Sequence, residues 1–426
     1  MTKFRLATRE TFSSFSVRNF RLFFVGQGVS QVGNWLMLVA QTLLVIELGG
    51  NGVAIGILTA FQFGPILLLG AWAGLIADRS DKRKLLFGVQ VFAMAQSFAM
   101  AALAFTGDPP LLAVYAVAAA GGVAMAFDNP ARRSFVVEMV PVEKVQNAVS
   151  LNSAMMTSSR IIGPALAGLL ITTVGFGWAF LLDGVSYVAV LVALAMMRTS
   201  ELRPAPVTRR GKGQVRDGLR YVRGVPELWI PLVMMALVGT LAFNFNVVYP
   251  LMVTRTFHSS TAMFTVLFSV LSVGSLLGAL WSARRKTIDV RDVARASAFF
   301  GAAMLLFSVV PSLAWAFPVA LVVGAGSISF LTTSTAIVQI EAAPEMRGRV
   351  LALQAIVFLG STPIGGPILG YIVDTFGPRW GVAVGGLAGV TAAVWGLWMY
   401  RRVRGSLSAD VPRPEPVDVE IPEPVA

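Results

Sequence analysis

Twelve stretches of about 20 mostly apolar residues recur along the chain, and they constrain its fold more than any other feature. Such a run matches the roughly 30 Å of hydrocarbon in a bilayer, where a lone segment satisfies its backbone hydrogen bonds only as a helix. The sequence therefore predicts an all-α integral membrane protein with twelve transmembrane helices. They lie near 21–47, 53–77, 85–106, 111–128, 148–173, 178–197, 229–252, 261–282, 296–311, 314–338, 349–373 and 380–400.

Composition and charge agree with a membrane protein. The chain is 56% hydrophobic and 13% charged, whereas soluble proteins have roughly a quarter of their residues charged. If the N-terminus is cytoplasmic, 31 of the 34 lysines and arginines fall in cytoplasmic segments, which is the positive-inside pattern and not a nucleic-acid surface. We expect a multi-pass protein of the cell membrane (the inner membrane where there are two), surrounded by lipid, with both termini in the cytoplasm.

The chain has no cysteine and one histidine, His258 in a predicted outer loop. Disulfides, thiol catalysis and cysteine- or histidine-built metal sites are therefore excluded. The sequence also has no nucleotide-binding loop and no Ser-His arrangement, so it gives little support to a membrane enzyme. We expect no metal, no cofactor and no nucleic-acid partner.

One stretch occurs twice, at 138–168 and 341–370. In both copies an acidic residue lies three positions before a proline, and a Gly-Pro pair ends a hydrophobic run 23 residues after that proline. The copies are offset by 203 residues, about half the chain, which indicates duplication. We expect an N-terminal six-helix half at 1–198, a cytoplasmic linker at 199–226, a C-terminal six-helix half at 227–402 and a disordered cytoplasmic tail at 403–426.

The linker contains an amphipathic pattern. Val215, Leu219 and Val222 follow a helical spacing, and Arg216, Arg220 and Arg223 form a parallel stripe. This pattern suits a short helix lying on anionic lipid, and a docking surface for another protein is the alternative.

Residues 74–84 read GLIADRSDKRK and resemble the loop between helices two and three of the major facilitator superfamily. The resemblance implies two six-helix halves around a midplane cavity, and a latch in which Asp78 contacts a neighbouring helix end or arginine. A basic loop that follows the positive-inside rule would explain the lysines but not an acid at a helix C-terminus. The expected gate and latch residues are Gly74, Asp78, Arg79, Arg83, Arg132 and Arg133.

Residues 163–168 read GPALAG and resemble the Gly-Pro signature of the superfamily's antiporters. With NPARR at 129–133 and RIIGP at 160–164, they are similar to the branch that contains siderophore exporters and macrolide-efflux proteins. The chain departs from many drug exporters because it has no arginine between 111 and 127. Glycine and proline permit helix kinks and close packing. The expected kink residues are Gly163, Pro164, Gly168, Gly366, Pro367 and Gly370.

The first predicted helix carries four amide side chains on one face, Gln27, Gln31, Asn34 and Gln41. Such a face either bonds to other helices or lines a cavity, and four amides favour the cavity. The C-terminal half adds polar candidates on its seventh and tenth helices. The expected cavity residues are Gln27, Gln31, Asn34, Gln41, Asn244, Tyr249, Ser327 and Ser334.

Two charged residues lie well inside predicted spans, Arg160 and Asp183. Intramembrane charges are functional candidates by default. Burial favours the protonated form of a carboxylic acid, whereas arginine keeps its charge. We therefore predict that Asp183 carries the proton and that Arg160 tunes it or holds an anionic substrate. The alternatives are a structural tie of Arg160 to backbone carbonyls or Asp128, and an Asp183 wetted near the outer surface.

These features favour a secondary transporter that exports a small amphipathic molecule, such as a drug, macrolide or siderophore-like compound, by alternating access driven by the proton gradient. An importer or facilitator of a small solute, a passive channel or receptor, and a membrane enzyme are the alternatives. We expect a monomer whose partners are its small-molecule substrate and protons.

Overall fold

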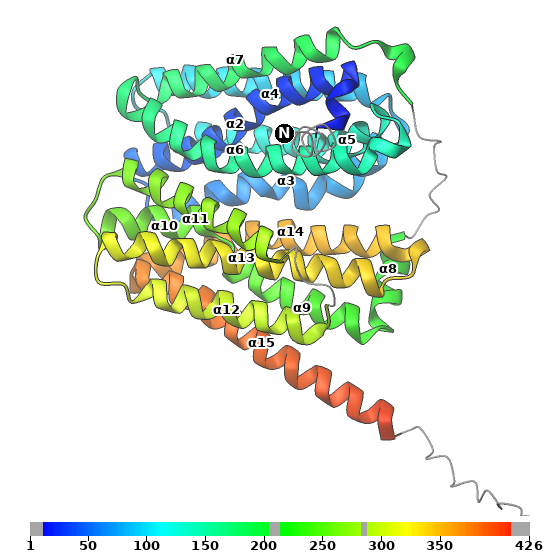
Figure 1. The fold of residues 1–426 in the computed structure, drawn as a ribbon. Coiled ribbons are helices and arrows are strands. Elements are labelled where there is room, and N and C mark those ends of the chain that lie inside the picture. The colour runs from blue at the N-terminus through cyan, green and yellow to red at the C-terminus, as the bar shows by residue number, and fades with distance from the viewer. Residues whose placement is uncertain (1–11, 204–213, 283–287, 410–426) are drawn as a thin grey trace, which may run out of the picture.

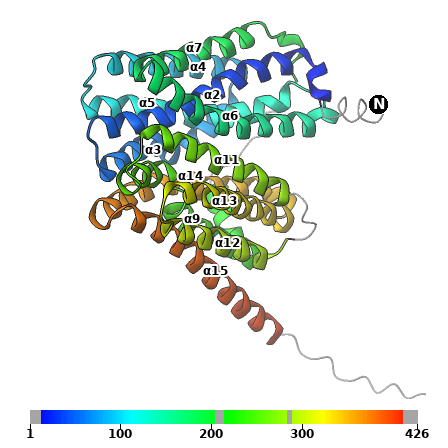
Figure 2. The same ribbon diagram turned by 60° about the vertical axis from the view of Figure 1, so that its left-hand side comes forward.

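The computed structural model describes residues 12–203, 214–282 and 288–409, and in this part of the chain every regular element is a helix. The helices form two bundles, one from each half of the sequence (Figure 1). A view turned by 60° shows the same two bundles stacked against each other (Figure 2). The predicted division into two six-helix halves is thus present in the architecture.

The N-terminal half begins with a short 3-10 turn, Ser13–Ser16, whose Ser14 contacts the start of α6. In this bundle α2 packs against α6 and α7, α4 against α5 and α7, and α3 against α5. Its helices are α2 (Arg18–Glu47), α3 (Gly52–Arg79), α4 (Lys82–Phe105), α5 (Leu111–Glu138), α6 (Val145–Thr173) and α7 (Phe176–Ala195).

In the C-terminal half, α12 packs against α13 and α15, α11 against α13, and α9 against α14 and α15. Its helices are α9 (Pro226–Leu241), α10 (Phe245–Leu251), a π-helical turn at Met252–Thr256, α11 (Thr261–Ser282), α12 (Val290–Ser308), α13 (Leu313–Glu341), α14 (Pro344–Phe376) and α15 (Pro378–Ala409). The core of this half is rich in phenylalanine, including a Tyr249–Phe307 stack with ring centroids 4.7 Å apart.

Eleven segments among the described residues are long and apolar enough to cross a membrane. The remaining predicted span, 296–311, corresponds to α12, whose first turns carry Arg291, Asp292 and Arg295. These charges lower its apolar character, but α12 packs within the bundle like its neighbours. The prediction of an all-α membrane protein with twelve helices in two halves is confirmed.

Two predicted boundaries were wrong. The fourth helix does not end near residue 128, because α5 continues through Pro130 to Glu138. Proline is tolerated inside membrane helices, and here the helix continues past it, with the Ser134 hydroxyl donating to the Pro130 carbonyl at 2.8 Å. At the C-terminus α15 runs to Ala409, past the expected start of the tail, and the rest of the tail lies outside the described residues.

The seventh helix is not continuous over 229–252. It breaks between α9 and α10, where Asn244 leaves the helical conformation with φ −95° and ψ 46°. The Asn244 amide donates to the Thr240 carbonyl at 2.7 Å, which satisfies one backbone group at the break. Gly365 of α14 lies directly against this carbonyl and leaves no room for a side chain.

The linker helix α8 (Gln214–Arg223) packs on the start of α14, and the predicted contact of its arginine stripe with anionic lipid stays a prediction. Val222 is 1% exposed, and Gly218 faces Leu353 of α14. The Tyr221 hydroxyl accepts a hydrogen bond from the Ala343 backbone N–H at 3.0 Å. These contacts tie α8 to the start of α14, while Leu219 remains exposed.

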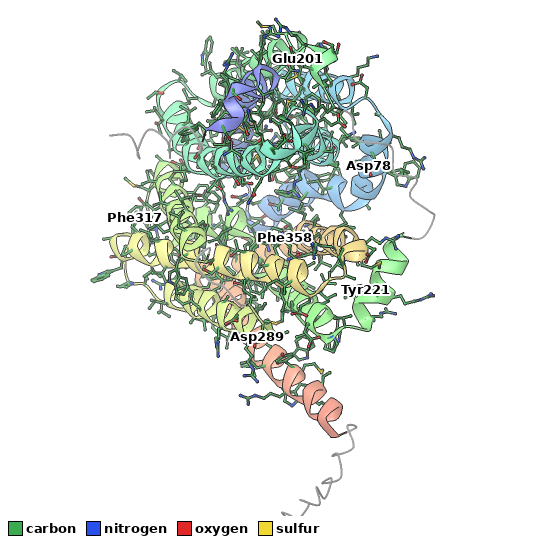
Figure 3. The ribbon with its side chains drawn as sticks, turned by 45° about the vertical axis from the view of Figure 1, so that its right-hand side comes forward. Asp78, Glu201, Tyr221, Asp289, Phe317 and Phe358 are labelled. Carbon is green, nitrogen blue, oxygen red and sulfur yellow. The ribbon has the colours of Figure 1, made fainter. Side chains whose placement is uncertain are left out.

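We call the end of the bundle that holds α8 the linker end, and the opposite end the far end. Asp78 and Tyr221 both lie at the linker end, on different halves (Figure 3). The two halves meet through α3 with α14 and through α6 with α11. At the far end, a Cβ on Gly56 would lie 2.5 Å from the Gly366 carbonyl, and one on Gly52 would lie 2.6 Å from the Gly370 carbonyl. Only glycine permits backbones to approach so closely.

Towards the linker end, the facing sides of α3 and α14 are no longer in contact. Gly74 and Gly348 lie 18 residues, or about five helical turns, from Gly56 and Gly366. They therefore occupy the same faces of α3 and α14, yet a Cβ at either position would meet no atom within 4 Å. The α3–α14 seam is closed at the far end and open at the linker end.

The far-end closure also includes an ionic contact. Asp374 of α14 accepts hydrogen bonds from the backbone N–H groups of Gly52 and Val53, both at 2.8 Å. Arg255 donates to the same carboxylate at 2.8 Å. A carboxylate at a helix N-terminus is favoured by the unpaired N–H groups and the helix dipole. Sequence reasoning did not identify Asp374, whose partners come from α3 and from the turn after α10.

Candidate functional site

Asp183 lies inside the N-terminal half, on α7, and is 1% exposed. Its Oδ2 accepts a hydrogen bond from the Ser97 hydroxyl of α4 at 2.6 Å. Its Oδ1 has no hydrogen-bond partner and lies against Gly33 of α2, where any side chain would displace it. No cation pairs with Asp183 in the described chain. The alternative of an acid wetted near the surface does not fit this burial.

Tyr187 extends this site by one helical turn. It lies on the same face of α7 as Asp183, and its hydroxyl donates to Asn34 Oδ1 at 3.0 Å. The Asn34 amide in turn donates to the Ser30 carbonyl at 3.2 Å. Tyr187 itself is 3% exposed, so this polar chain is buried between α2 and α7.

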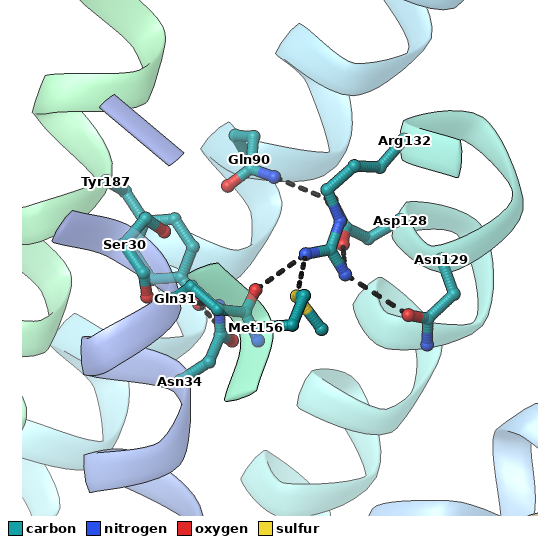
Figure 4. A network of polar contacts seen from close by, with 9 residues as sticks. All are labelled: Ser30, Gln31, Asn34, Gln90, Asp128, Asn129, Arg132, Met156 and Tyr187. Carbon is teal, nitrogen blue, oxygen red and sulfur yellow. Dashed lines mark hydrogen bonds and ion pairs between the residues drawn. The ribbon is translucent and has the colours of Figure 1, made fainter. Parts of the chain in front are cut away.

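A buried ion pair lies beside this chain (Figure 4). Arg132 and Asp128, one turn apart on α5, are joined at 2.9 Å, with side chains 6% and 14% exposed. Arg132 also donates to Gln31 Oε1 of α2 at 2.7 Å, and Gln90 of α4 donates to Asp128 at 2.8 Å. The pair is therefore linked to the polar face of α2 and to α4.

This pair corrects one sequence prediction. Arg132 is buried within the N-terminal bundle, and its role at a cytoplasmic gate stays a prediction. Arg160 and Asp183 were expected to be the only charges well inside, but Asp128 and Arg132, on either side of Pro130 in α5, are also largely buried. The error followed from ending the helix at that proline. An Asp and an Arg spaced i, i+4 in a helix that continues were the available signal.

The other predicted gate residues have separate structural contacts. Arg83 donates to the carbonyls of Leu194 and Ala195 at 2.7 and 3.3 Å, and so holds the end of α7. Asp78 is partly buried in the last turn of α3, and Arg79 is exposed. Arg133 is also exposed.

A second ion pair lies at the linker end. Lys82 and Glu138 are joined at 2.6 Å, with both side chains largely buried, and they connect the start of α4 to the end of α5. Sequence reasoning left this contact out, although Glu138 begins the first copy of the repeat. Its position holds the linker end of the N-terminal bundle together.

Arg160 lies near the middle of α6, and its guanidinium lies over the Trp35 ring of α2, 5.4 Å from the centroid. It makes no hydrogen bond or ion pair within the described residues, and its Nε is buried. Neither expected partner is in place, since Asp128 pairs with Arg132 and Asp183 bonds Ser97. The structure therefore does not bring Arg160 and Asp183 together as a pair.

The four amide side chains on one face of α2 make different contacts. Gln31 and Asn34 belong to the network of Figure 4, and Gln41 accepts a hydrogen bond from Gln62 of α3 at 2.7 Å. Gln27 is 1% exposed, and neither of its amide atoms has a partner. Three of the four amides thus act as interhelical bonds, and a cavity role for this face remains a prediction.

The predicted cavity residues of the C-terminal half are also buried. Tyr249 is fully enclosed between α10 and α12, stacked on Phe307, with its hydroxyl unpartnered. Ser327 donates to the Gly324 carbonyl of its own helix at 2.8 Å, and Ser334 has no partner. Asn244 lies at the helix break, and its Oδ1 has no partner. Tyr249 is thus part of the packed core here, and a cavity role for these residues stays a prediction.

The two Gly-Pro segments occupy different positions. Both lie in continuous helices, α6 and α14. Gly163 packs on Trp35 within the N-terminal half, and Gly168 on Thr265 of α11. Gly366 and Gly370 both pack on α3 across the α3–α14 seam. Gly366 and Gly370 of the second segment therefore both make inter-half contacts, and a kink at either proline remains a prediction.

Two hollows in the described part of the molecule lie away from these residues. One of about 300 Å³, between α4 and α5, is lined by Lys84 and apolar side chains. The other, of about 220 Å³, is bordered by Trp281, Arg295 and Ser329. Neither contains a predicted cavity residue.

Comparison with known proteins gives the chain's family. The family model described as transmembrane secretion effector matches residues 9–418, nearly the whole chain. The chain belongs to the transmembrane secretion effector family of the major facilitator superfamily. It is therefore a secondary transporter and not an enzyme. The resemblance proposed from residues 74–84, 129–133 and 160–168 is confirmed.

Characterised relatives of this transporter are distant. It is 24% identical over 367 residues to the staphyloferrin A transporter of Staphylococcus aureus, with 84% of this chain and 90% of the relative covered. It is 21% identical over 364 residues to macrolide efflux protein A of Streptococcus pyogenes, with the same coverage. These identities support an efflux family but do not identify the substrate.

Among solved structures, the transporter resembles a bacterial homologue of the human lysosomal transporter Spinster, described as inward-facing and unoccupied. The TM-score is 0.69 at 15% identity, covering 93% of this chain and 98% of that chain. At this identity the likeness concerns the fold alone, which is that of a multi-pass membrane protein.

Proposed function

We propose that this transporter is a proton-coupled exporter of a small amphipathic molecule, with its linker end in the cytoplasm of the cell. The observation that carries the proposal is Asp183, a carboxylate buried among α2, α4 and α7 with one oxygen unpartnered and no cation paired to it. An uncompensated charge at membrane depth is costly, so the acid is favoured in its protonated form. It can then release the proton when water or a charge reaches it. The efflux relatives support the direction of transport.

Alternating access follows from the seam between the halves. With the linker end in the cytoplasm, the open faces at Gly74 and Gly348 correspond to a cytoplasm-open state. In the opposite state we expect these two glycines to meet as Gly56 and Gly366 do here. Asp78 lies one turn beyond Gly74, where it would serve as the predicted latch of the closed linker end.

This closure can be tested by cross-linking, because the chain has no native cysteine. The double variant Gly74→Cys/Gly348→Cys should form a disulfide that traps the linker end closed and blocks transport until it is reduced. The control pair Trp72→Cys/Gly348→Cys places one thiol on another face of α3 and should not cross-link. Equal cross-linking of both pairs would contradict the rocking motion.

Transport itself is tested in cells that lack the gene. Compounds retained by the deletion strain and released after the gene is restored identify the substrate, and a protonophore should restore retention. Release that is insensitive to the protonophore would indicate a passive facilitator. Compounds that accumulate only when the gene is present would indicate an importer. Either result would overturn the proposal.

A further inference from the structure

The α2, α6 and α11 helices meet beside an arginine with no counter-charge. Arg160 of α6 lies over Trp35 of α2, and the Trp35 ring is 6.5 Å from the Phe268 ring of α11. The next residue along α6, Ile161, accepts a hydrogen bond from Ser269 of α11 at 3.2 Å. Arg160 therefore lies at the seam between the two halves.

The hydrogen-bond donors at this position have no acceptor among the described residues. The guanidinium has five N–H donors and no acceptor, and within the described residues it bonds to none. The indole N–H of Trp35 is also buried and unpartnered. A cation–π contact offsets only part of the lost hydration of arginine. Buried donors without partners are rare in native proteins and call for a partner not present in the chain.

The protein's own acids do not serve this role. Asp128 is paired with Arg132. Asp183 lies on the other side of α2, against Gly33, whereas Trp35 two residues later points away from it. Arg160 remains partly exposed as a residue, so a molecule in the seam can reach it.

We infer that Arg160 and Trp35 form the binding site for the carboxylate of an organic anion whose apolar body packs against Trp35 and Phe268. The planar guanidinium fork matches a carboxylate in a bidentate geometry, and the indole N–H adds a third donor. The single positive charge suits a monoanionic group. This inference rests on the proposed export function and names its substrate class, an amphipathic carboxylic acid.

Binding to purified protein in detergent, without any gradient, tests the site. The probes are 1-naphthoate, the neutral 1-naphthamide and the cationic 1-naphthylmethylammonium, measured by isothermal titration calorimetry. The wild-type protein should bind naphthoate about ten-fold or more tightly than the amide, as expected for hydrogen bonds to a charged group. No preference for the anion in the wild-type protein would overturn the inference.

Variants locate the preference. Arg160→Gln should abolish the preference for the anion, and Arg160→Lys should keep a weaker one. Trp35→Phe keeps an aromatic ring but removes the indole N–H, so it should lower the affinity for naphthoate. Arg198→Gln, at a surface arginine paired with Glu201, is the matched control and should change nothing. If Arg160→Gln does not yield folded protein, Arg160→Lys and Trp35→Phe test the site instead. Unchanged naphthoate affinity in both variants would overturn the proposed carboxylate site.

The two proposals fail separately. Proton-driven efflux of a cationic compound together with no anion preference would overturn the carboxylate site and leave the exporter intact. Anion binding that depends on Arg160 in a protein without gradient-driven efflux would overturn the exporter and leave the site.

Discussion

The two halves of this transporter share a helical plan and a Gly-Pro segment, but they differ in what they bury. Among the described residues, the buried charged side chains are Arg132, Glu138 and Asp183, all in the N-terminal half. The buried polar groups of the C-terminal half are neutral hydroxyls and amides, such as Ser297, most of which bond to backbone carbonyls. A charge in hydrocarbon costs far more than a hydroxyl, so we assign the proposed proton chemistry to the half that retains such charges.

The C-terminal half has a different specialisation. Its seventh helix is broken at Asn244, and α14 presents glycines to the other half along the seam. Its charge contact, Asp374 with Arg255, lies at the far end, where the seam is closed. Under the proposed function, the first half would carry the coupling and the second half would supply the moving contacts of the seam.

Replacing Asp183 should have the largest effect. Asp183→Asn keeps the shape and the bond to Ser97 but cannot release a proton, so efflux in proteoliposomes should fall to the rate seen without a pH gradient while substrate binding persists. The matched control is Ser334→Ala, a buried unpartnered group of the C-terminal half, which should retain gradient dependence. Gradient-driven efflux by Asp183→Asn would remove the assignment of coupling to the N-terminal half.

Breaking the buried ion pair between Asp128 and Arg132 should lower the free energy of unfolding. Arg132→Gln or Asp128→Asn leaves one charge uncompensated, and each should destabilise the protein by about 3–5 kcal/mol. The double variant should recover part of this loss, since neither charge then remains. Ser327→Ala in the other half should cost no more than about 1 kcal/mol. Thermal unfolding in detergent measures all four, and equal effects in both halves would contradict the comparison.

Weakening the far-end closure should shift the balance between states. Asp374→Asn removes the charge that accepts from Gly52, Val53 and Arg255, which should move the ratio of states about ten-fold away from the form seen here. A cysteine placed at Gly74 would then react more slowly with a water-soluble thiol reagent, because the linker end closes. Glu201→Gln, in a surface pair, is the control. Unchanged reactivity would show that Asp374 does not hold the far end.

The proline substitutions should have the smallest effect and should differ between halves. Pro367 is adjacent to Gly366 in the seam, whereas Pro164 is adjacent to Gly163, which packs on α2 within one half. Pro367→Ala should therefore slow transport more than Pro164→Ala, with normal membrane insertion of both. Initial efflux rates normalised to protein amount measure this. Equal rates for both variants would mean that the two segments do the same work.

The amino-acid sequence by itself determined the membrane class, the helix number and the two halves. Run length and apolarity suffice for this, because lipid offers the backbone no partner other than its own helix. The same reasoning singled out Asp183 and Arg160, since any charge inside an apolar run is conspicuous. It also recognised the family through short motifs at 74–84 and 160–168.

Only the tertiary structure decided which groups meet. Spacing along a helix gives the face on which a residue lies but not the helix that faces it, so the contact of Arg132 with Gln31 and the surroundings of Asp374 and Arg160 could not be read from spacing. Gly56 and Gly74 lie on the same face of α3, yet one touches α14 and the other meets open space. That contrast depends on the tilt of one half against the other, a property of the whole packed molecule and not of any single stretch.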